Sequence, residues 1–199
     1  MPLPKISSVG TFVPDHVLTN ADLEKMVDTS DEWILTRTGI SERHIAEPNE
    51  ATSDLAARAA QSALERAGVL PTEVDAIIVC TVTPDMFFPA TACLVQHKIG
   101  ATKAWGFDLS AACAGFIYGI TTAANLVMAG TNKRVLVIGA DTMSRIIDYT
   151  DRATCVLFGD GAGAFLIEPS TEEGLGFIGS HNEIDGSGGG SLYMPAGGS

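Results

Sequence analysis

Continuous apolar runs alternate with amphipathic stretches along the chain, a pattern that predicts strands alternating with helices. The Val- and Ile-rich runs at 75–83 and 134–141 are typical of strands covered on both faces. Shorter strands are predicted at 5–14 and 105–110. This order predicts an α/β fold with a mainly parallel sheet.

The glycine-rich region after residue 155 predicts further strands. We expect two strands around a glycine turn over 156–169 and one more over 174–185. The motif GDGAGA at 159–164 matches the G-x-G-x-x-A pattern of a dinucleotide-binding loop, which must open a helix. The following AFLIEP is strand-like instead, so we interpret the motif as a tight turn between closely packed elements.

Capping residues and stop glycines mark the helices. The predicted caps are Asn20 for a helix at 21–27, Thr29 with Glu32 for a helix that Gly39 ends, and Ser53 for a long amphipathic helix that Gly68 ends. A further helix is predicted at 90–100.

The segment 109–132 carries no charged residue, and its length alone could span a membrane. It contains Thr121, Thr122 and Asn125, and it lacks the leucine and isoleucine density of a spanning helix. We therefore predict a helix buried on all sides by protein and no membrane segment.

Composition narrows the class of protein. The 199 residues are 46% hydrophobic and carry a formal net charge of −12, which argues against nucleic-acid binding and against adhesion to anionic membranes. Four widely spaced cysteines form no C-x-x-C pair, so neither a metal site nor a disulfide framework is predicted. The N-terminus lacks the pattern of a signal peptide, and we expect a cytoplasmic protein.

The segment DLSAACAGFIYGI, residues 108–120, surrounds Cys113 with small residues at the start of an apolar helix. A helix N-terminus favours the thiolate, which is the nucleophilic form of cysteine, and its backbone N–H groups can stabilise an oxyanion. Cys113 is thus a candidate acyl-accepting nucleophile. The alternative is a small buried hydrophobe, which is the interpretation we give to Cys80, Cys93 and Cys155.

Trp33 and Arg37 are four residues apart and share one face of their predicted helix. An indole can stack on adenine, and a guanidinium can pair with phosphate, so the pair suits a nucleotide-tailed substrate. The alternative is that Trp33 fills the core while Arg37 pairs with a carboxylate.

Four motifs in order, DTSDEWILTRTGI, FFPATACLVQ, DLSAACAGFIYG and LFGDGAGA, resemble β-ketoacyl-[acyl-carrier-protein] synthase III of the thiolase superfamily. The resemblance runs from about Lys5 to residue 187. It implies one half of a five-layer αβαβα fold and an acyltransferase that starts fatty-acid biosynthesis. Cys113 would take an acyl group from acetyl-CoA or another short acyl-CoA and condense it with malonyl-acyl carrier protein, without a cofactor.

The resemblance also implies residue roles in binding CoA. Thr29, Trp33, Arg37 and Arg152 match residues that line the CoA entrance. For Arg152 the alternative is a surface salt bridge with Asp148 or Asp151, and for Thr29 it is the helix cap alone.

Phe88 matches a phenylalanine that crosses a homodimer interface to shape the partner's acyl pocket. Its alternative is an ordinary core aromatic before a proline. A dimer is implied only by the resemblance.

The family's catalytic histidine and asparagine motifs are not found in this sequence, since His16, His44, His97 and His181 all lie in other contexts. We therefore expect residues 1–184 to form an N-terminal half, 185–199 to be a connecting loop or truncated end, and a complementary C-terminal half to complete the site. Two rival interpretations stay open: a related condensing enzyme of polyketide or quinolone synthesis, and a non-catalytic half-subunit.

Overall fold

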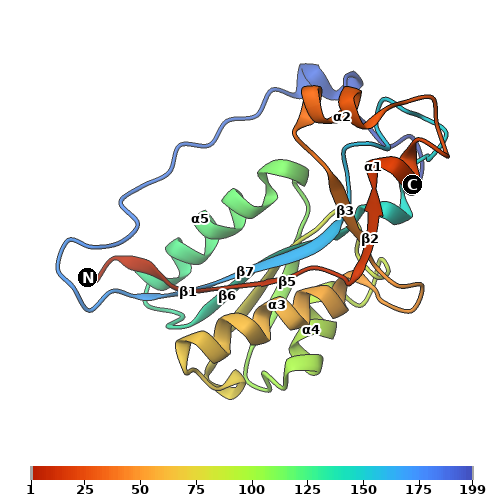
Figure 1. The fold of residues 1–199 in the computed structure, drawn as a ribbon. Helices are drawn as coiled ribbons and strands as arrows, with labels where there is room; N and C mark the ends of the chain where they lie inside the picture. Colours follow the sequence, from red (N-terminus) through yellow and green to blue (C-terminus); the bar gives the residue numbers. More distant parts are fainter. Residues whose placement is uncertain (1, 199) are drawn as a thin grey trace.

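The computed structural model describes residues 2–198 and contains two sheets with helices on both faces of the larger one (Figure 1). The strands are β1 (Pro4–Phe12), β2 (His16–Thr19), β3 (Glu42–Ile45), β4 (Ala76–Cys80), β5 (Trp105–Leu109), β6 (Val135–Thr142) and β7 (Asp160–Pro169). The α-helices are α1 (Asn20–Leu23), α2 (Asp31–Thr38), α3 (Thr52–Ala67), α4 (Thr91–Ile99) and α5 (Gly115–Met128). Short 3-10 helices are η1 (Pro71–Glu73), η2 (Ala112–Ala114), η3 (Met143–Arg145) and η4 (Gly186–Gly190).

The large sheet has the strand order β1-β7-β6-β4-β5. β4 pairs in parallel with β5 and β6, whereas β7 pairs antiparallel with both β6 and β1. Four strands therefore run in one direction and only β7 opposes them. The predicted α/β class with a mainly parallel sheet is confirmed, and every residue of the central strand β4 is buried, as its unbroken apolar run requires.

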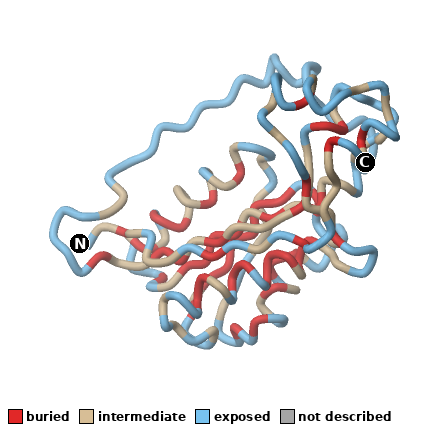
Figure 2. Tube along the Cα trace, viewed as in Figure 1, coloured by how far each residue is buried: buried red, intermediate tan, exposed pale blue. Residues whose placement is uncertain are grey.

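The sheet is covered by helices on both faces (Figure 2). On one face α3 and α4 pack against the sheet through a core rich in alanine, and on the other α5 packs against β4, β6 and β7. The small residues of α3 allow a very close approach to β1: a Cβ added at Gly10 would lie 2.2 Å from the carbonyl oxygen of Ala59. The chain thus forms an α/β/α unit.

The prediction that the 109–132 helix is buried on all sides is wrong for the described chain. The side of α5 that faces the sheet is buried, but Ile117 is 55% exposed on another side. None of the described helices is both long enough and apolar enough to cross a membrane.

The helix ends at Gly39 and Gly68 are confirmed, with both glycines in the left-handed region. The predicted caps are each displaced. Thr19 rather than Asn20 caps α1, and Ser30 rather than Thr29 caps α2 by accepting a hydrogen bond from the backbone N–H of Trp33 at 3.1 Å. At the start of both helices, two adjacent residues have side chains that can cap. The backbone conformation determines which of the two is the N-cap.

The cap of α3 is Ala51, which has no side-chain acceptor, and Ser53 lies within the first helical turn. Ser53 instead hydrogen-bonds to Asp85 from a distant loop. Tertiary contacts therefore replace the local cap that the sequence predicts.

Two strand predictions near the C-terminal end are wrong. Only β7 forms within 156–169, because Val156 turns into a small core with Leu23 and Ile34 instead of pairing in the sheet. No strand forms over 174–185, where Ile178 and Ile184 are highly exposed. The dinucleotide loop at 159–164 is rejected correctly, since Asp160 begins a strand and not a helix. The interpretation of the motif as a tight turn is wrong, because residues 160–164 lie inside β7. The domain boundary between residues 184 and 185 stays a prediction.

Candidate active site

The loops that carry three of the predicted functional residues leave the same edge of the large sheet. Phe88 follows β4, Cys113 follows β5 and Arg152 follows β6, and these three strands are parallel. The carboxyl ends of parallel strands therefore bring together residues that are far apart in the sequence, and such edges are where α/β proteins bind ligands.

Cys113 lies on a strained turn between β5 and α5. Ala112, directly before it, has φ +45°, the one positive value among the non-glycine residues of the described chain. The 3-10 turn η2 contains Cys113 and runs into α5 at Gly115. The thiol is exposed, so the alternative that Cys113 is a buried hydrophobe is wrong. Strain of this kind is typical of functional sites, and here it presents the thiol at a helix N-terminus.

Glycines let α5 lie unusually close to the sheet beneath this turn. A Cβ added at Gly119 would lie 2.5 Å from the sulfur of Cys80 and 2.9 Å from a methyl carbon of Val137. Burial, together with the nearby Asp141 carboxylate, raises the pKa of the Cys80 thiol to about 12. Cys80 therefore stays protonated near neutral pH and is no competing nucleophile.

The other two cysteines differ from each other. Cys155 is buried as predicted, and burial raises the pKa of its thiol. Cys93 lies on α4 and is exposed, so its interpretation as a buried hydrophobe is wrong.

Two guanidinium groups stack on one indole ring. The Cζ atom of Arg37 lies 4.7 Å from the centre of the Trp33 ring, and that of Arg152 lies 4.6 Å from it. We call these three residues the Trp33 cluster. Cation–π contacts of this kind hold two positive charges beside an aromatic ring. The ring suits stacking with adenine, and the guanidinium groups suit pairing with phosphates. The structure thus brings together three of the four predicted CoA-binding residues.

The structure also tests the alternative interpretations of the three residues of the Trp33 cluster. Arg152 approaches the carboxylate of Asp28 at 3.9 Å, and its ion pair is with neither Asp148 nor Asp151. Within the described residues, Arg37 makes no ion pair. Trp33 is half-buried and packs on a small core as well as carrying the two arginines.

Thr29, the fourth predicted residue, precedes α2. Its Oγ1 atom is buried and has no hydrogen-bond partner within residues 2–198. It is therefore not the helix cap that the T-x-x-E pattern predicted, and its role toward CoA stays a prediction.

Phe88 is 85% exposed and its neighbour Phe87 is 82% exposed, so the alternative of an ordinary core aromatic is wrong. Two exposed phenylalanines on one loop are typical of a surface that another polypeptide covers.

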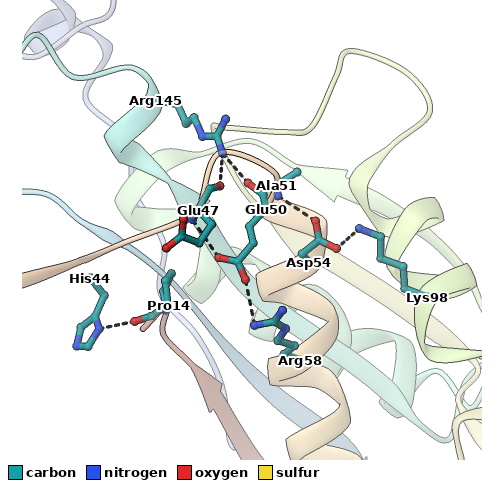
Figure 3. Close-up of polar contacts among 9 residues, drawn as sticks. All are labelled: Pro14, His44, Glu47, Glu50, Ala51, Asp54, Arg58, Lys98 and Arg145. Carbon is teal, nitrogen blue, oxygen red and sulfur yellow. Dashed lines mark hydrogen bonds and ion pairs between the residues drawn. The ribbon is translucent and has the colours of Figure 1, made fainter. Parts of the chain in front are cut away.

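Polar contacts that no sequence motif indicates join the loops around this edge (Figure 3). Arg145 of η3 donates hydrogen bonds to the backbone carbonyls of Glu47 at 2.9 Å and Glu50 at 2.7 Å. The Glu50 carboxylate in turn pairs with Arg58 of α3 at 3.0 Å. Arg145 thereby fixes the start of the loop that carries Arg152. No local signal could reveal contacts across about a hundred residues. Among the residues described, no group of His, Cys, Asp or Glu could hold a metal ion.

Comparisons with known proteins agree with this geometry. The family profile of 3-Oxoacyl-[acyl-carrier-protein (ACP)] synthase III matches residues 107–186. The β-ketoacyl-[acyl-carrier-protein] synthase III of Solibacter usitatus is 68% identical over 201 residues, covering 100% of this chain and 61% of the relative. The chain thus spans about three-fifths of the length of these curated relatives.

Solved structures show the same fold. The β-ketoacyl-[acyl-carrier-protein] synthase III of Thermus thermophilus matches with a TM-score of 0.90 and 50% identity, covering 95% of this chain and 58% of that one. The priming β-ketosynthase of the R1128 polyketide pathway matches with a TM-score of 0.83 and 41% identity, over 85% of this chain and 51% of its own. The higher identity lies with proteins named β-ketoacyl-[acyl-carrier-protein] synthase III, and the chain matches members of that family along its whole length.

Proposed function

We propose that the protein containing this chain is an acyltransferase that condenses an acyl-CoA primer, acetyl-CoA first of all, with malonyl-acyl carrier protein to start fatty-acid synthesis in the cytoplasm. The observation that carries the proposal is the exposed Cys113 on its strained turn at the start of α5. The Trp33 cluster supplies a place for the nucleotide end of CoA. The CoA thioester is a substrate, and the proposal requires neither a cofactor nor a metal.

The reaction proceeds in two half-reactions. The Cys113 thiolate attacks the thioester carbonyl, a bond between sulfur and the acyl carbon forms, and CoA leaves as its thiolate and takes up a proton. Backbone N–H groups at the start of α5 stabilise the oxyanion. Malonyl-carrier protein then loses carbon dioxide, its carbanion attacks the acyl-cysteine, and the Cys113 thiolate is released.

The second half-reaction needs groups from a complementary C-terminal half, which we propose packs on the exposed side of α5. Ile117 is 55% exposed there, and an apolar helix side of this kind is normally covered. Within a homodimer, Phe88 would reach the acyl pocket of the second copy. Because this chain carries a net charge of −12, we place the basic surface that docks the acidic carrier protein in the complementary half.

Intact mass spectrometry of the complete protein before and after addition of acetyl-CoA tests this function. We expect one acetyl group, located by peptide mapping on the fragment that contains Cys113. An adduct on exposed Cys93, or no adduct, would contradict the proposal. The same assay with a panel of acyl-CoAs separates the rival, because a preference for long or aromatic primers would favour polyketide or quinolone synthesis.

Substituting Arg152 with alanine should weaken CoA binding about tenfold, since one desolvated cation–π and phosphate contact is lost. The chain has only two tryptophans, Trp33 and Trp105. The Arg152→Ala substitution is therefore made in a Trp105→Phe variant, in which Trp33 is the one tryptophan of this chain whose fluorescence is measured. Titration with CoA should quench this fluorescence as the adenine approaches the indole.

Arg66→Ala is the matched control, because Arg66 lies on α3, donates a hydrogen bond to the backbone carbonyl of Val9 at 3.0 Å and belongs neither to the Trp33 cluster nor to the contacts of Arg145. Its Kd should stay within about twofold of the wild type. Equal weakening by both substitutions would argue against the Trp33 cluster as the CoA site.

A further inference from the structure

The loop after β4 presents its apolar side chains outward. We call residues 81–90 the aromatic loop. Met86, Phe87 and Phe88 are 48%, 82% and 85% exposed, and residues 86–89 make no hydrogen bond within the described chain. The position of the two phenylalanine rings therefore depends on what anchors the loop on either side of them.

Asp85 is the last anchor before the aromatic residues. Its Oδ1 atom accepts a hydrogen bond from the backbone N–H of Ser53 at 2.8 Å, and its Oδ2 atom accepts one from the Ser53 hydroxyl at 2.6 Å. Ser53 is fully buried, and its hydroxyl also accepts a hydrogen bond from Nζ of Lys98 on α4 at 2.7 Å. The next anchor is the backbone N–H of Thr91, which donates to Asp108 at 2.6 Å.

Asp85 also replaces a missing helix cap. The N-cap residue of α3 is Ala51, whose side chain has no acceptor, so the N–H of Ser53 in the first turn needs another partner. The Asp85 carboxylate provides it and also complements the positive end of the helix dipole. A loop with exposed aromatics is thus attached to the end of a 16-residue helix, one of the most firmly packed elements of the core.

The start of the loop is held separately. Oδ1 of Asp141 on β6 accepts hydrogen bonds from the hydroxyls of Thr81 at 2.9 Å and Thr83 at 2.8 Å. These contacts fix the end of β4, but they lie several residues before the phenylalanines. Only Asp85 stands directly beside the exposed segment on its N-terminal side.

We infer that Asp85 is a positioning residue that sets which acyl-chain lengths the enzyme accepts, by fixing Phe87 and Phe88 through its contacts with Ser53. The inference rests on the proposed function, in which Phe88 forms a wall of an acyl pocket. A wall that can shift leaves room for additional methylene groups, and a pocket discriminates chain length only as far as its walls are held.

The experiment compares Asp85→Ala with Asp54→Ala in the complete protein. Asp54 supports the same end of α3, accepting a hydrogen bond from the N–H of Ala51 at 2.9 Å and pairing with Lys98 at 2.6 Å (Figure 3), but its carboxylate makes no hydrogen bond to the aromatic loop within the described residues. Both substitutions should lower the Tm. The rate of Cys113 acylation, as kcat/KM, is measured for acetyl-CoA and hexanoyl-CoA.

We expect the ratio of acetyl to hexanoyl kcat/KM to fall about tenfold in Asp85→Ala and to stay within about twofold of the wild type in Asp54→Ala. Equal ratios in the two variants would overturn the inference. If Asp85→Ala does not accumulate, Ser53→Ala decides, because it removes the hydroxyl that donates to Asp85 and leaves the backbone N–H contact in place: a lowered ratio supports the inference and a wild-type ratio overturns it. Wild-type protein acylated by no CoA ester would refute the proposed function itself and the inference with it, whereas normal acylation with an unmoved ratio refutes the inference alone.

Discussion

Replacing Cys113 with alanine in the complete protein is expected to abolish acyl transfer, lowering kcat by about 10³-fold or more. Alanine retains the small side chain that the strained turn tolerates but removes the sulfur that would carry the acyl group. Release of carbon dioxide from malonyl-carrier protein and formation of the condensed product are measured separately, because only the second requires an acyl-cysteine.

Cys93→Ala is the matched control, since Cys93 is the other exposed cysteine of the described chain and lies on α4. It should retain wild-type kcat. Substantial condensation by Cys113→Ala would remove Cys113 from its proposed role, whatever Cys93→Ala does.

Substituting Gly10 with alanine should lower the free energy of unfolding by about 3 kcal/mol or more. A Cβ at this position would lie 2.2 Å from the carbonyl oxygen of Ala59 and 2.3 Å from the backbone nitrogen of Ala63. Both atoms belong to the backbone of α3, so the clash cannot be relieved by a change of rotamer. Relief requires α3 to move away from β1. Urea denaturation followed by circular dichroism measures the effect.

Gly163→Ala provides the comparison in the neighbouring strand. Gly163 of β7 pairs with Thr11 of β1, and a Cβ there would meet nothing within 4 Å. Its unfolding midpoint should lie close to that of the wild type. A Gly10→Ala protein as stable as Gly163→Ala would show that α3 does not need the close approach to β1.

Elements with an unbroken or strongly periodic pattern could be predicted from the sequence. The Val- and Ile-rich runs that become β4 and β6 are buried on both faces of the sheet, so burial alone dictates their composition. The amphipathic pattern of α3 and its stop at Gly68 are equally local. These signals need no knowledge of the rest of the chain.

Elements that depend on distant partners could not be predicted. The pair β2–β3 joins His16–Thr19 to Glu42–Ile45 across two intervening helices, and neither strand has enough apolar residues to stand out. Valine favours strands, but Val156 lies outside the sheet and packs on Leu23 and Ile34. In each case tertiary packing overrides local propensity.

Some features of the candidate site likewise follow from local sequence, and others depend on distant partners. Cys113 among small residues, and Trp33 one helical turn from Arg37, follow from local spacing. The resemblance assigns Arg152 to the same site, but its stacking on that indole ring depends on the arrangement of the sheet. The same is true of Asp85, which caps a helix 32 residues earlier in the chain.

The pairing of β1 with β7 has a consequence for how the chain is made. Pro4 lies opposite Pro169, so the first strand to leave the ribosome finds its partner only after nearly all of this unit has been synthesised. Until then β1 is an unpaired edge with apolar side chains, the kind of segment that chaperones bind and that aggregates when left alone. Completion of β7 is therefore the event that lets β1 pair, which completes the sheet and ends the exposure of the nascent chain to aggregation.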